Sequence, residues 1–400
     1  MKTSPDMTNQ VVGILGGGQL GRMLAMAARR MAVRTVVWTG GREAPAAQVA
    51  DMVVDLPFDD PAGLAEFCKA ATVATVEFEN IPLETMRAVA GRVPLHPSPE
   101  AVGICQNREA EKEFLRSNGI PCTGFAVVND ADELAAAMKR FPGPWVLKTA
   151  DSGYDGHGQL RVSEDADPHS VWHEFGPHRG VLEQWVSFRM EISVMVARGA
   201  DGETATYDPA ENHHREHILD WSLVPARVDA EIAVKARRIA VRIAEALDYR
   251  GVMGVEFFVT RNGGLLVNEI APRPHNSGHH TLDACATSQF EQQLRAVLGL
   301  PPGSPRLLTP VAMLNLLGDM WPDGAESPDW RPLFADGEAN LHLYGKTSVS
   351  GRRKMGHANF LGTTAEDALA RAVRLKERWL EEARKPQAGK RPERPAVPAF

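Results

Sequence analysis

The chain has 400 residues, which is long enough for two or three domains with substantial cores. A hydrophobic content of 44% and a charged content of 24% are typical of a globular protein, and the formal net charge of -7 argues against a nucleic-acid-binding protein. The four cysteines are scattered without C-x-x-C spacing, and we see no secretory or membrane-spanning apolar run. We therefore expect a cytoplasmic protein that contacts no membrane.

The stretch "GILGGGQLGRM", residues 13–23, predicts a strand, a tight glycine turn and a helix. Its glycines fit G-x-G-x-x-G, a pattern whose backbone N–H groups can bind any anion. An NAD-binding turn also needs an acidic residue at the end of the second strand. Here the strand expected at 33–38 runs into Thr39-Gly40-Gly41, and Glu43 comes several residues later. The pattern disfavours an NAD-dependent oxidoreductase, which stays open as an alternative.

The hydrophobic pattern divides the chain into several units. Strands expected at 11–15, 33–38 and 73–78 alternate with helices expected at 19–32 and 61–71, and this alternation indicates a parallel α/β sheet. Proline-rich stretches near residues 93–100 and 301–310 suggest boundaries. We expect a flexible N-terminus, an N-terminal α/β domain, a central domain, a small C-terminal domain and a flexible tail at residues 1–10, 11–105, 106–300, 301–385 and 386–400.

A second glycine loop, in "WVLKTADSGYDGHGQ" at 145–159, follows a predicted strand that ends at Lys148. It is not a Walker A sequence. A lysine beside a mobile glycine loop can nevertheless hold phosphates and close over them. Taken alone, such a lysine is usually just solvated, but next to a Mg²⁺ site it would indicate a nucleoside triphosphate.

The stretch "GVEFFVTRNGGLLVNEI", 254–270, predicts a hairpin with a type I′ turn at Asn262-Gly263. A two-residue loop places Thr260 opposite Leu265, Phe258 opposite Val267 and Glu256 opposite Glu269. Two carboxylates side by side repel each other, and a divalent cation reverses the sign of that interaction. Mg²⁺ is the expected ion, because it is usually held by one or two carboxylates and substrate phosphates. The alternative is a pair of solvated edge-strand glutamates.

Two histidine-rich stretches, "ENHHREH" at 211–217 and "RPHNSGHH" at 273–280, invite a zinc hypothesis. Neither contains H-E-x-x-H, and no cysteine stands near the first. His214 and His217 could share a helical face, but their polar neighbours fit a substrate loop at least as well.

Seven motifs together resemble the N5-carboxyaminoimidazole ribonucleotide synthetases, a family of the ATP-grasp superfamily, over about residues 10–365. They are "GGGQLGRM", "VEFEN", "LKTADSGYDGHGQ", "LEQWV", "VNEIAPRPHNSGHH", "DACATSQFEQ" and "LHLYGK". The resemblance implies an N-terminal parallel α/β domain, a two-lobed α+β ATP-grasp centre and a small C-terminal domain. In that family the first glycine loop faces the phosphorylated substrate, and the nucleotide lies elsewhere.

The same resemblance implies the reaction. ATP and bicarbonate would form carboxyphosphate, which would carboxylate 5-aminoimidazole ribonucleotide and leave ADP and phosphate. ATP and Mg²⁺ are the implied cofactors, and a homodimer is the implied assembly.

The resemblance also implies the site residues. The nucleotide would be held by Arg108, Lys148, Gly153, Tyr154, Asp155, Gly156, His157, Gly158, Gln159, Glu183, Gln184, Trp185, Val186, Glu191, His214, Asn268 and Glu269. The metal ion would be held by Glu256 and Glu269, and the ribonucleotide by Gln19, Leu20, Glu77, Asn276, Lys346, Arg353 and Lys354. Catalytic roles fall to Tyr154, Arg273 and Lys346, and Glu79 is a rival to Glu77 for the ring amine.

Two further alternatives stay open. One is the formate-dependent glycinamide ribonucleotide formyltransferase of the same superfamily. The corresponding stretch of that enzyme resembles "RPHDTG", with Asp at the position of Asn276 in this chain. The other is a silent nucleotide-binding module, which the presence of both Glu256 and Glu269 disfavours.

Overall fold

The computed structural model describes residues 7–41, 43–151, 158–322 and 327–384. The expected flexible tail, most of the expected flexible N-terminus and the loop residues Gly153 to His157 lie outside these ranges. None of the described helices is long and apolar enough to cross a membrane. All four cysteines are free thiols.

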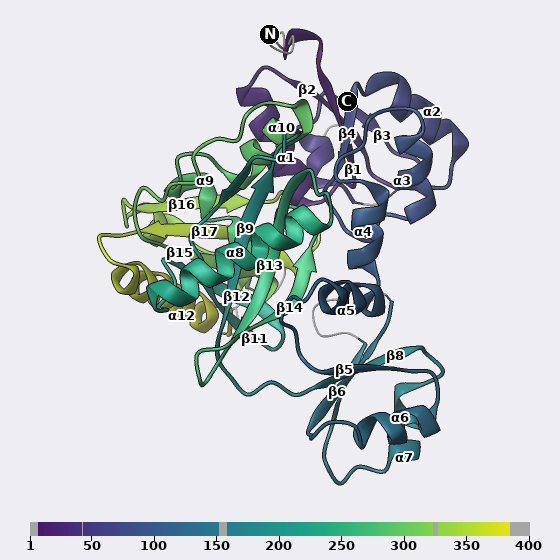
Figure 1. Cartoon of the computed structure of the whole chain (residues 1–400). Coiled ribbons are helices and arrows are strands. Elements are labelled where there is room, and N and C mark those ends of the chain that lie inside the picture. Colours follow the sequence, from purple (N-terminus) through teal and green to yellow (C-terminus); the bar gives the residue numbers. More distant parts are fainter. Residues whose placement is uncertain (1–6, 42, 152–157, 323–326, 385–400) are drawn as a thin grey trace.

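The N-terminal unit is a parallel four-stranded sheet with helices packed against it (Figure 1), as the alternation of apolar runs predicts. Its strands, in spatial order, are β3 (Met52–Val54), β2 (Arg34–Trp38), β1 (Val11–Leu15) and β4 (Val73–Val76). Its helices are α1 (Gln19–Arg30), α2 (Pro61–Ala70), α3 (Leu83–Ala90) and α4 (Pro99–Gln106), with short 3-10 turns η1 (Met7–Asn9) and η2 (Pro45–Gln48). The expected strand 73–78 ends two residues early, so Glu77 follows the strand.

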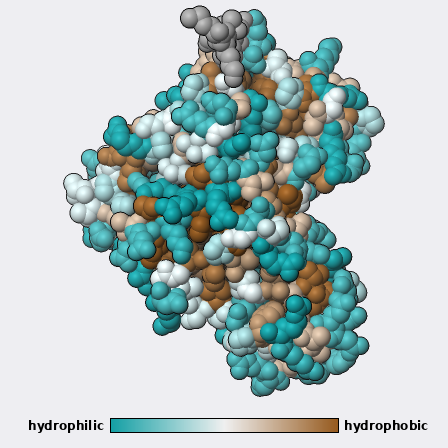
Figure 2. Space-filling model, in the orientation of Figure 1, coloured by the Kyte–Doolittle hydropathy of each residue, from teal (hydrophilic) through white to brown (hydrophobic). Residues whose placement is uncertain are grey.

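A smaller antiparallel sheet forms a separate lobe at the bottom of Figure 1, and Figure 2 shows this lobe standing out from the body. Its order is β5 (Phe125–Val128), β8 (Gly180–Gln184), β6 (Trp145–Thr149) and β7 (Gln159–Val162), covered by α6 (Ala131–Met138) and α7 (Pro168–Phe175). Leu134, Leu147 and Leu182 form its buried core. Helix α5 (Arg108–Ser117) lies between this lobe and the larger sheet.

The larger sheet has nine strands among the described residues, and the strand pairs within these residues are antiparallel. Its order is β14 (Leu265–Ala271), β13 (Gly251–Thr260), β9 (Phe188–Arg198), β11 (Ala210–Arg215), β12 (Ile218–Val224), β15 (Val311–Leu317), β17 (Lys354–Leu361) and β16 (Ala339–Leu343), with β10 (Thr204–Thr206) beside β9. The remaining elements are α8 (Ala230–Ala246), η3 (Asn276–Gly278), α9 (Thr281–Ala284), α10 (Gln289–Leu298), η4 (Gly318–Met320), α11 (Arg331–Phe334) and α12 (Ala365–Arg384). The expected C-terminal unit thus extends the sheet of the central unit.

Helix α10 joins the N-terminal unit to the larger sheet. The side chain of Gln293 donates to Thr75 Oγ1 on β4 at 2.7 Å and accepts from the backbone N–H of Val252 on β13 at 2.5 Å. Because both contacts are buried, they are costly to break. The glycine turn after β1 is therefore held in a defined position relative to the β13–β14 hairpin.

The β13–β14 hairpin differs from its prediction at the turn. Thr260 N–H donates to Gly264 O at 2.9 Å, so the loop has three residues, 261–263, and the predicted two-residue type I′ turn is wrong. Gly263 supplies the left-handed backbone that this loop requires, with φ of 80°. Val259, not Thr260, pairs with Leu265, and Phe258 pairs with Leu266.

A β-bulge restores the predicted pairing further along the same hairpin. Phe257 pairs with Val267, but Glu256 pairs with Glu269, so Asn268 is the extra residue on β14. The two one-residue shifts cancel, and the opposition of Glu256 and Glu269 is confirmed.

The histidine-rich stretch at 211–217 is a strand and turn, so the shared helical face considered for His214 and His217 is wrong. Arg215 pairs with Ile218 across a two-residue turn, and both turn residues are left-handed, Glu216 with φ of 51° and His217 with φ of 67°. These are the backbone angles of a type I′ turn, formed here without Asn or Gly.

Candidate functional site

A cavity of about 960 Å³ opens between the small lobe and the larger sheet. Thirteen of the residues predicted for nucleotide, metal or substrate line it: Lys148, Gln159, Glu183, Gln184, Trp185, Val186, Glu191, His214, Glu256, Asn268, Glu269, Asn276 and Lys354. They come from both lobes. Lys148, predicted to bind phosphate, and the carboxylate pair, predicted to bind a metal ion, therefore line the same cavity.

The paired carboxylates lie on the larger-sheet side of this cavity. Burial and the nearby charge of Glu269 together raise the pKa of Glu256 to about 7. A divalent cation fits between two opposed carboxylates, because it would stabilise the ionised form of Glu256, which is disfavoured in its absence. The solvated-edge alternative is wrong for Glu256, whose side chain is only 18% exposed.

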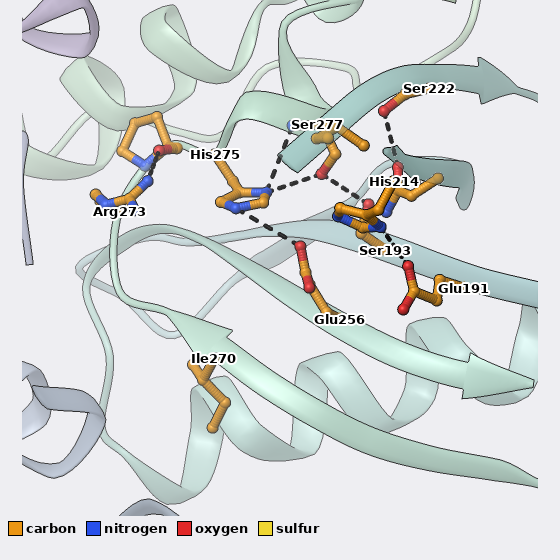
Figure 3. Close-up of polar contacts among 12 residues, drawn as sticks. Glu191, Ser193, His214, Ser222, Glu256, Ile270, Arg273, His275 and Ser277 are labelled. Atoms are coloured by element: carbon orange, nitrogen blue, oxygen red, sulfur yellow. Dashed lines mark hydrogen bonds and ion pairs between the residues drawn. The ribbon is translucent and has the colours of Figure 1, made fainter. Parts of the chain in front are cut away.

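Two histidines flank Glu256 (Figure 3). His214 is hydrogen-bonded through Nδ1 to Glu191, and although burial lowers its pKa, the contacts with Glu191 and Glu256 outweigh burial and raise it. His275 Nε2 lies 3.7 Å from Glu256 Oε1, and its Nδ1 is 2.9 Å from Ser277 Oγ. Burial and the cations Arg273 and Lys354 lower the pKa of His275, which keeps this imidazole neutral.

On the small-lobe side, Glu183 is buried among three cations. Its carboxylate is 3.0 Å from Lys148 Nζ, 3.6 Å from Lys112 Nζ and 3.7 Å from Arg108 Nε. Burial alone would raise the pKa of Glu183, but the three cations outweigh burial and lower it to about 2. One carboxylate thus sits among three positive charges, which leaves this wall net positive and suited to phosphate.

Aromatic rings supply the apolar part of the cavity. Phe188 and Phe258 stack with ring centroids 4.7 Å apart, and Arg161 lies over the Trp185 ring at 4.5 Å. Trp185 is 40% exposed, which is unusual for so large a hydrophobic side chain. Such surfaces favour a flat ligand such as a nucleobase.

Arg273 does not line the large cavity, but it lies close to it. Its guanidinium holds Glu79 with two contacts, one of them 2.7 Å between Nη2 and Oε1. Burial would raise the pKa of Glu79, but Arg273 outweighs burial and lowers it. Glu79 is therefore already paired, which weighs against its rivalry with Glu77 for a ring amine.

The first glycine turn faces a carboxylate of its own chain. Glu77 accepts hydrogen bonds from the N–H groups of Gly18 at 2.9 Å and Gly21 at 3.1 Å. A Cβ on Gly16, which also has a φ of 103°, would lie 2.6 Å from Glu77 Oε1. The glycines are thus required by the close approach of Glu77. Gln19 begins α1 beside this contact, whereas the Leu20 side chain packs in the core, so only the main chain of Leu20 can reach a substrate.

A basic cluster lies next to the glycine turn. Lys346 Nζ donates to Lys354 O at 2.8 Å, and Arg353 pairs with Glu43 at 2.5 Å. Burial lowers the pKa of Lys346 to about 8, and the neighbouring charges of Arg353 and Lys354 act in the same direction. Glu43 also accepts from the Thr347 N–H at 2.8 Å. Because Glu43 is bound to this segment, it does not serve as the ribose-binding acid that an NAD site needs.

Of the predicted second glycine loop, Gly158 and Gln159 are described, and Gly158 has a φ of 72°. Gly153, Tyr154, Asp155, Gly156 and His157 lie outside the described residues, so their predicted roles stay predictions.

Sequence reasoning missed two polar residues here. His275 was considered only as part of a zinc motif, although its position between Arg273 and Asn276 could have indicated a role. Lys112 gave no signal, because it lies within a charged helix where most such lysines are solvated; its side chain is only 1% exposed.

Three family models match the chain: the ribonucleotide synthetase preATP-grasp domain over residues 9–106, the ATP-grasp domain over 113–290 and the phosphoribosylaminoimidazole carboxylase C-terminal domain over 311–371. An N5-carboxyaminoimidazole ribonucleotide synthase of Bacillus subtilis is 42% identical over 351 residues, which are 88% of this chain and 91% of that protein. An ADP complex of an N5-carboxyaminoimidazole ribonucleotide synthetase has a TM-score of 0.87 at 37% identity and covers 96% of this chain and 100% of its own.

A third relative was solved with both ligands. The N5-carboxyaminoimidazole synthase of Aspergillus clavatus, in complex with ADP and 5-aminoimidazole ribonucleotide, has a TM-score of 0.83 at 32% identity. The match covers 94% of this chain and 100% of that one.

Replacing Glu269 by Gln removes one of the two opposed carboxylates. We expect ATP-dependent turnover to fall by orders of magnitude, because the cation loses a ligand. We expect the melting temperature of the metal-free protein at pH 8 to stay level or rise. Because the pKa of Glu256 is raised from 4.5 to about 7 in the folded protein, the free energy of unfolding falls as pH rises through that range. Removing the Glu269 charge makes this fall smaller.

Thermal melts with and without Mg²⁺, together with steady-state rates, measure both effects. Glu203→Gln, which changes an exposed glutamate away from the cavity, is the matched control and should change neither. Full turnover of Glu269→Gln at saturating Mg²⁺ would show that the pair holds no metal.

Proposed function

The chain belongs to the N5-carboxyaminoimidazole ribonucleotide synthase family, and from that premise we propose how its own residues carry out the reaction. The protein is an ATP-grasp ligase that carboxylates 5-aminoimidazole ribonucleotide in purine biosynthesis at the expense of ATP. The observation that carries the proposed division of roles is the cavity itself, which has a cationic wall and a wall with two opposed carboxylates.

ATP lies across this cavity in our proposal. Its base contacts the segment from Glu183 to Val186 and the nearby aromatic rings, and its ribose contacts Glu191. Its phosphates bind Lys148 and Arg108, so Lys148 must exchange part of its contact with Glu183 for phosphate oxygens. His214 and Asn268 complete the nucleotide site. Glu256 and Glu269 hold Mg²⁺, which supplies charge neutralisation at the phosphates when it is bound.

Bicarbonate is the proposed carboxyl source. One of its oxygens attacks the γ-phosphorus, the bond to the β-phosphate oxygen breaks, and carboxyphosphate and ADP form. The ring amine then attacks the carboxyl carbon, phosphate leaves and the amine loses its proton. The protein contributes positioning and charge neutralisation to both steps, with Arg273 placed to act on the anionic intermediate.

The ribonucleotide lies between the N-terminal unit and the basic cluster. Its phosphate binds Lys346, Arg353 and Lys354, which are cations that complement a dianion. Its ring amine faces Glu77, which the amides of Gly18 and Gly21 orient. Asn276 has both amide atoms buried without a hydrogen-bond partner among the described residues, and such a group fits a polar ligand.

The formate-dependent alternative is disfavoured by Asn276 and by relatives that match nearly the whole chain and carry the synthase name. The homodimer and the cytoplasmic location stay predictions. Sedimentation of the purified protein would test the first of them.

We expect ADP release to require 5-aminoimidazole ribonucleotide and bicarbonate and not to respond to formate or glycinamide ribonucleotide. A coupled ADP assay in which each compound is omitted in turn measures this. Stimulation by formate equal to that by bicarbonate would overturn the substrate assignment and leave the nucleotide site intact.

We expect the affinity for 5-aminoimidazole ribonucleotide to fall as pH rises through about 8, the pKa of Lys346, because the neutral amine no longer attracts phosphate. The KM should rise about tenfold between pH 7 and pH 9 if this cation is required for binding. Lys346→Arg keeps its charge over that range and should lose most of the rise. An identical pH profile in both proteins would exclude Lys346 as the titrating group.

A further inference from the structure

Lys112 adds charge to the wall around Glu183, but the proposed reaction gives it no contact of its own with ATP or the ribonucleotide. It lies on α5, and its Nζ donates to the carbonyl oxygen of Asn268 at 2.9 Å while standing 3.6 Å from Glu183 Oε2. A buried ammonium is costly unless its donors are satisfied. One side chain therefore links the bulge on β14 with the carboxylate on β8.

The acceptor of this hydrogen bond is the bulged residue itself. Asn268 is the extra residue that changes the pairing of β14 between Val267 and Glu269. A bulge leaves its extra residue outside the ladder of strand hydrogen bonds, so the carbonyl needs a partner from elsewhere. Lys112 supplies that partner.

Two further hydrogen bonds hold the edge of β14 that faces α5. β14 is the first strand of the larger sheet, so one of its edges pairs with no other strand of the described ranges. Along this edge Ile270 N–H donates to Glu111 Oε2 at 3.0 Å, and Val267 N–H donates to Pro121 O at 2.8 Å. Figure 1 shows α5 lying beside this strand. Groups from α5 and the segment after it therefore bind the edge on both sides of the bulge.

We propose that Lys112 is a positioning residue for the metal site: it holds the bulge at Asn268 and thereby keeps Glu269 opposite Glu256. The inference rests on the proposed function, since it assigns the pair to the metal ion of a nucleotide complex. A one-residue slip in pairing turns every side chain beyond it to the other face of the strand. Without the bulge, the register set by the turn would place Asn268 opposite Glu256.

The test measures metal binding directly. Mn²⁺, as a probe for Mg²⁺, is titrated into the protein with saturating ADP, and free Mn²⁺ is followed by electron paramagnetic resonance. We expect Lys112→Met to weaken Mn²⁺ binding about tenfold or more, the usual effect of removing a group that orients metal ligands. ADP affinity without metal should fall by less than Mn²⁺ affinity does, because Lys148 and Arg108, to which we assign the phosphates, are both retained.

Lys376→Met is the matched control. Lys376 is a largely buried lysine, with 11% of its side chain exposed, that pairs with the carboxylate of Asp220, but it lies on α12 away from the cavity. We expect this variant to melt at a lower temperature and to bind Mn²⁺ as the wild type does. Its comparison with Lys112→Met separates lost stability from lost positioning.

Each outcome decides the proposal. Mn²⁺ binding by folded Lys112→Met within twofold of the wild type would overturn it. If that variant does not fold, Lys112→Leu, which also lacks a hydrogen-bond donor, takes its place under the same criterion. Failure of both to fold while Lys376→Met folds would assign Lys112 a purely structural role and overturn the proposal. A wild type that binds no ADP would instead refute the proposed function.

Discussion

The opposition of Glu256 and Glu269 across one hairpin is the constraint on which the rest of the site depends. Two like charges at paired positions destabilise a sheet, and burial adds to the cost for Glu256. The surrounding strand offsets this cost, because Val255, Phe257 and Val259 on the opposite face of β13 are fully buried in the main core. The pair therefore keeps this register, and its two opposed carboxylates suit the divalent cation that we propose there.

The opposite wall of the cavity has the reverse electrostatics. Around Glu183, three cations face one carboxylate, whereas the hairpin presents two carboxylates. A nucleoside triphosphate with its metal ion has both signs of charge along its length. Its phosphates complement the cationic wall, and its metal ion complements the hairpin. Because the two walls belong to different lobes, a bound metal–nucleotide complex would hold the lobes together.

Much of this arrangement could be predicted from the sequence where local pattern decides structure. The parallel N-terminal sheet and the hairpin strands follow from periodicity and turn residues. The pairing of Glu256 with Glu269 was predicted correctly, although the turn type was wrong. The error in the turn shifts the register by one residue, and the bulge at Asn268, which the sequence does not signal, shifts it back. The contacts of Lys112 and His275 could not be predicted, because each partner lies in another element, Asn268 for Lys112 and Glu256 for His275.

Arg273 is close to the groups proposed for both steps of the reaction, the formation of carboxyphosphate and the transfer of its carboxyl group to the amine. Burial would lower the pKa of Arg273, but Glu79, Glu77 and Glu269 together outweigh burial and raise it. Its charge thus interacts at once with Glu77 at the glycine turn and with Glu269 on the β13–β14 hairpin. Carboxyphosphate is a labile acyl phosphate, so it must move from the nucleotide to the ring amine without meeting water. In the proposed reaction, the guanidinium of Arg273, whose charge both Glu77 and Glu269 attract, would keep one positive charge near the anion at the start and at the end of that transfer. The pairing with Glu79 fixes this guanidinium in place before either substrate binds.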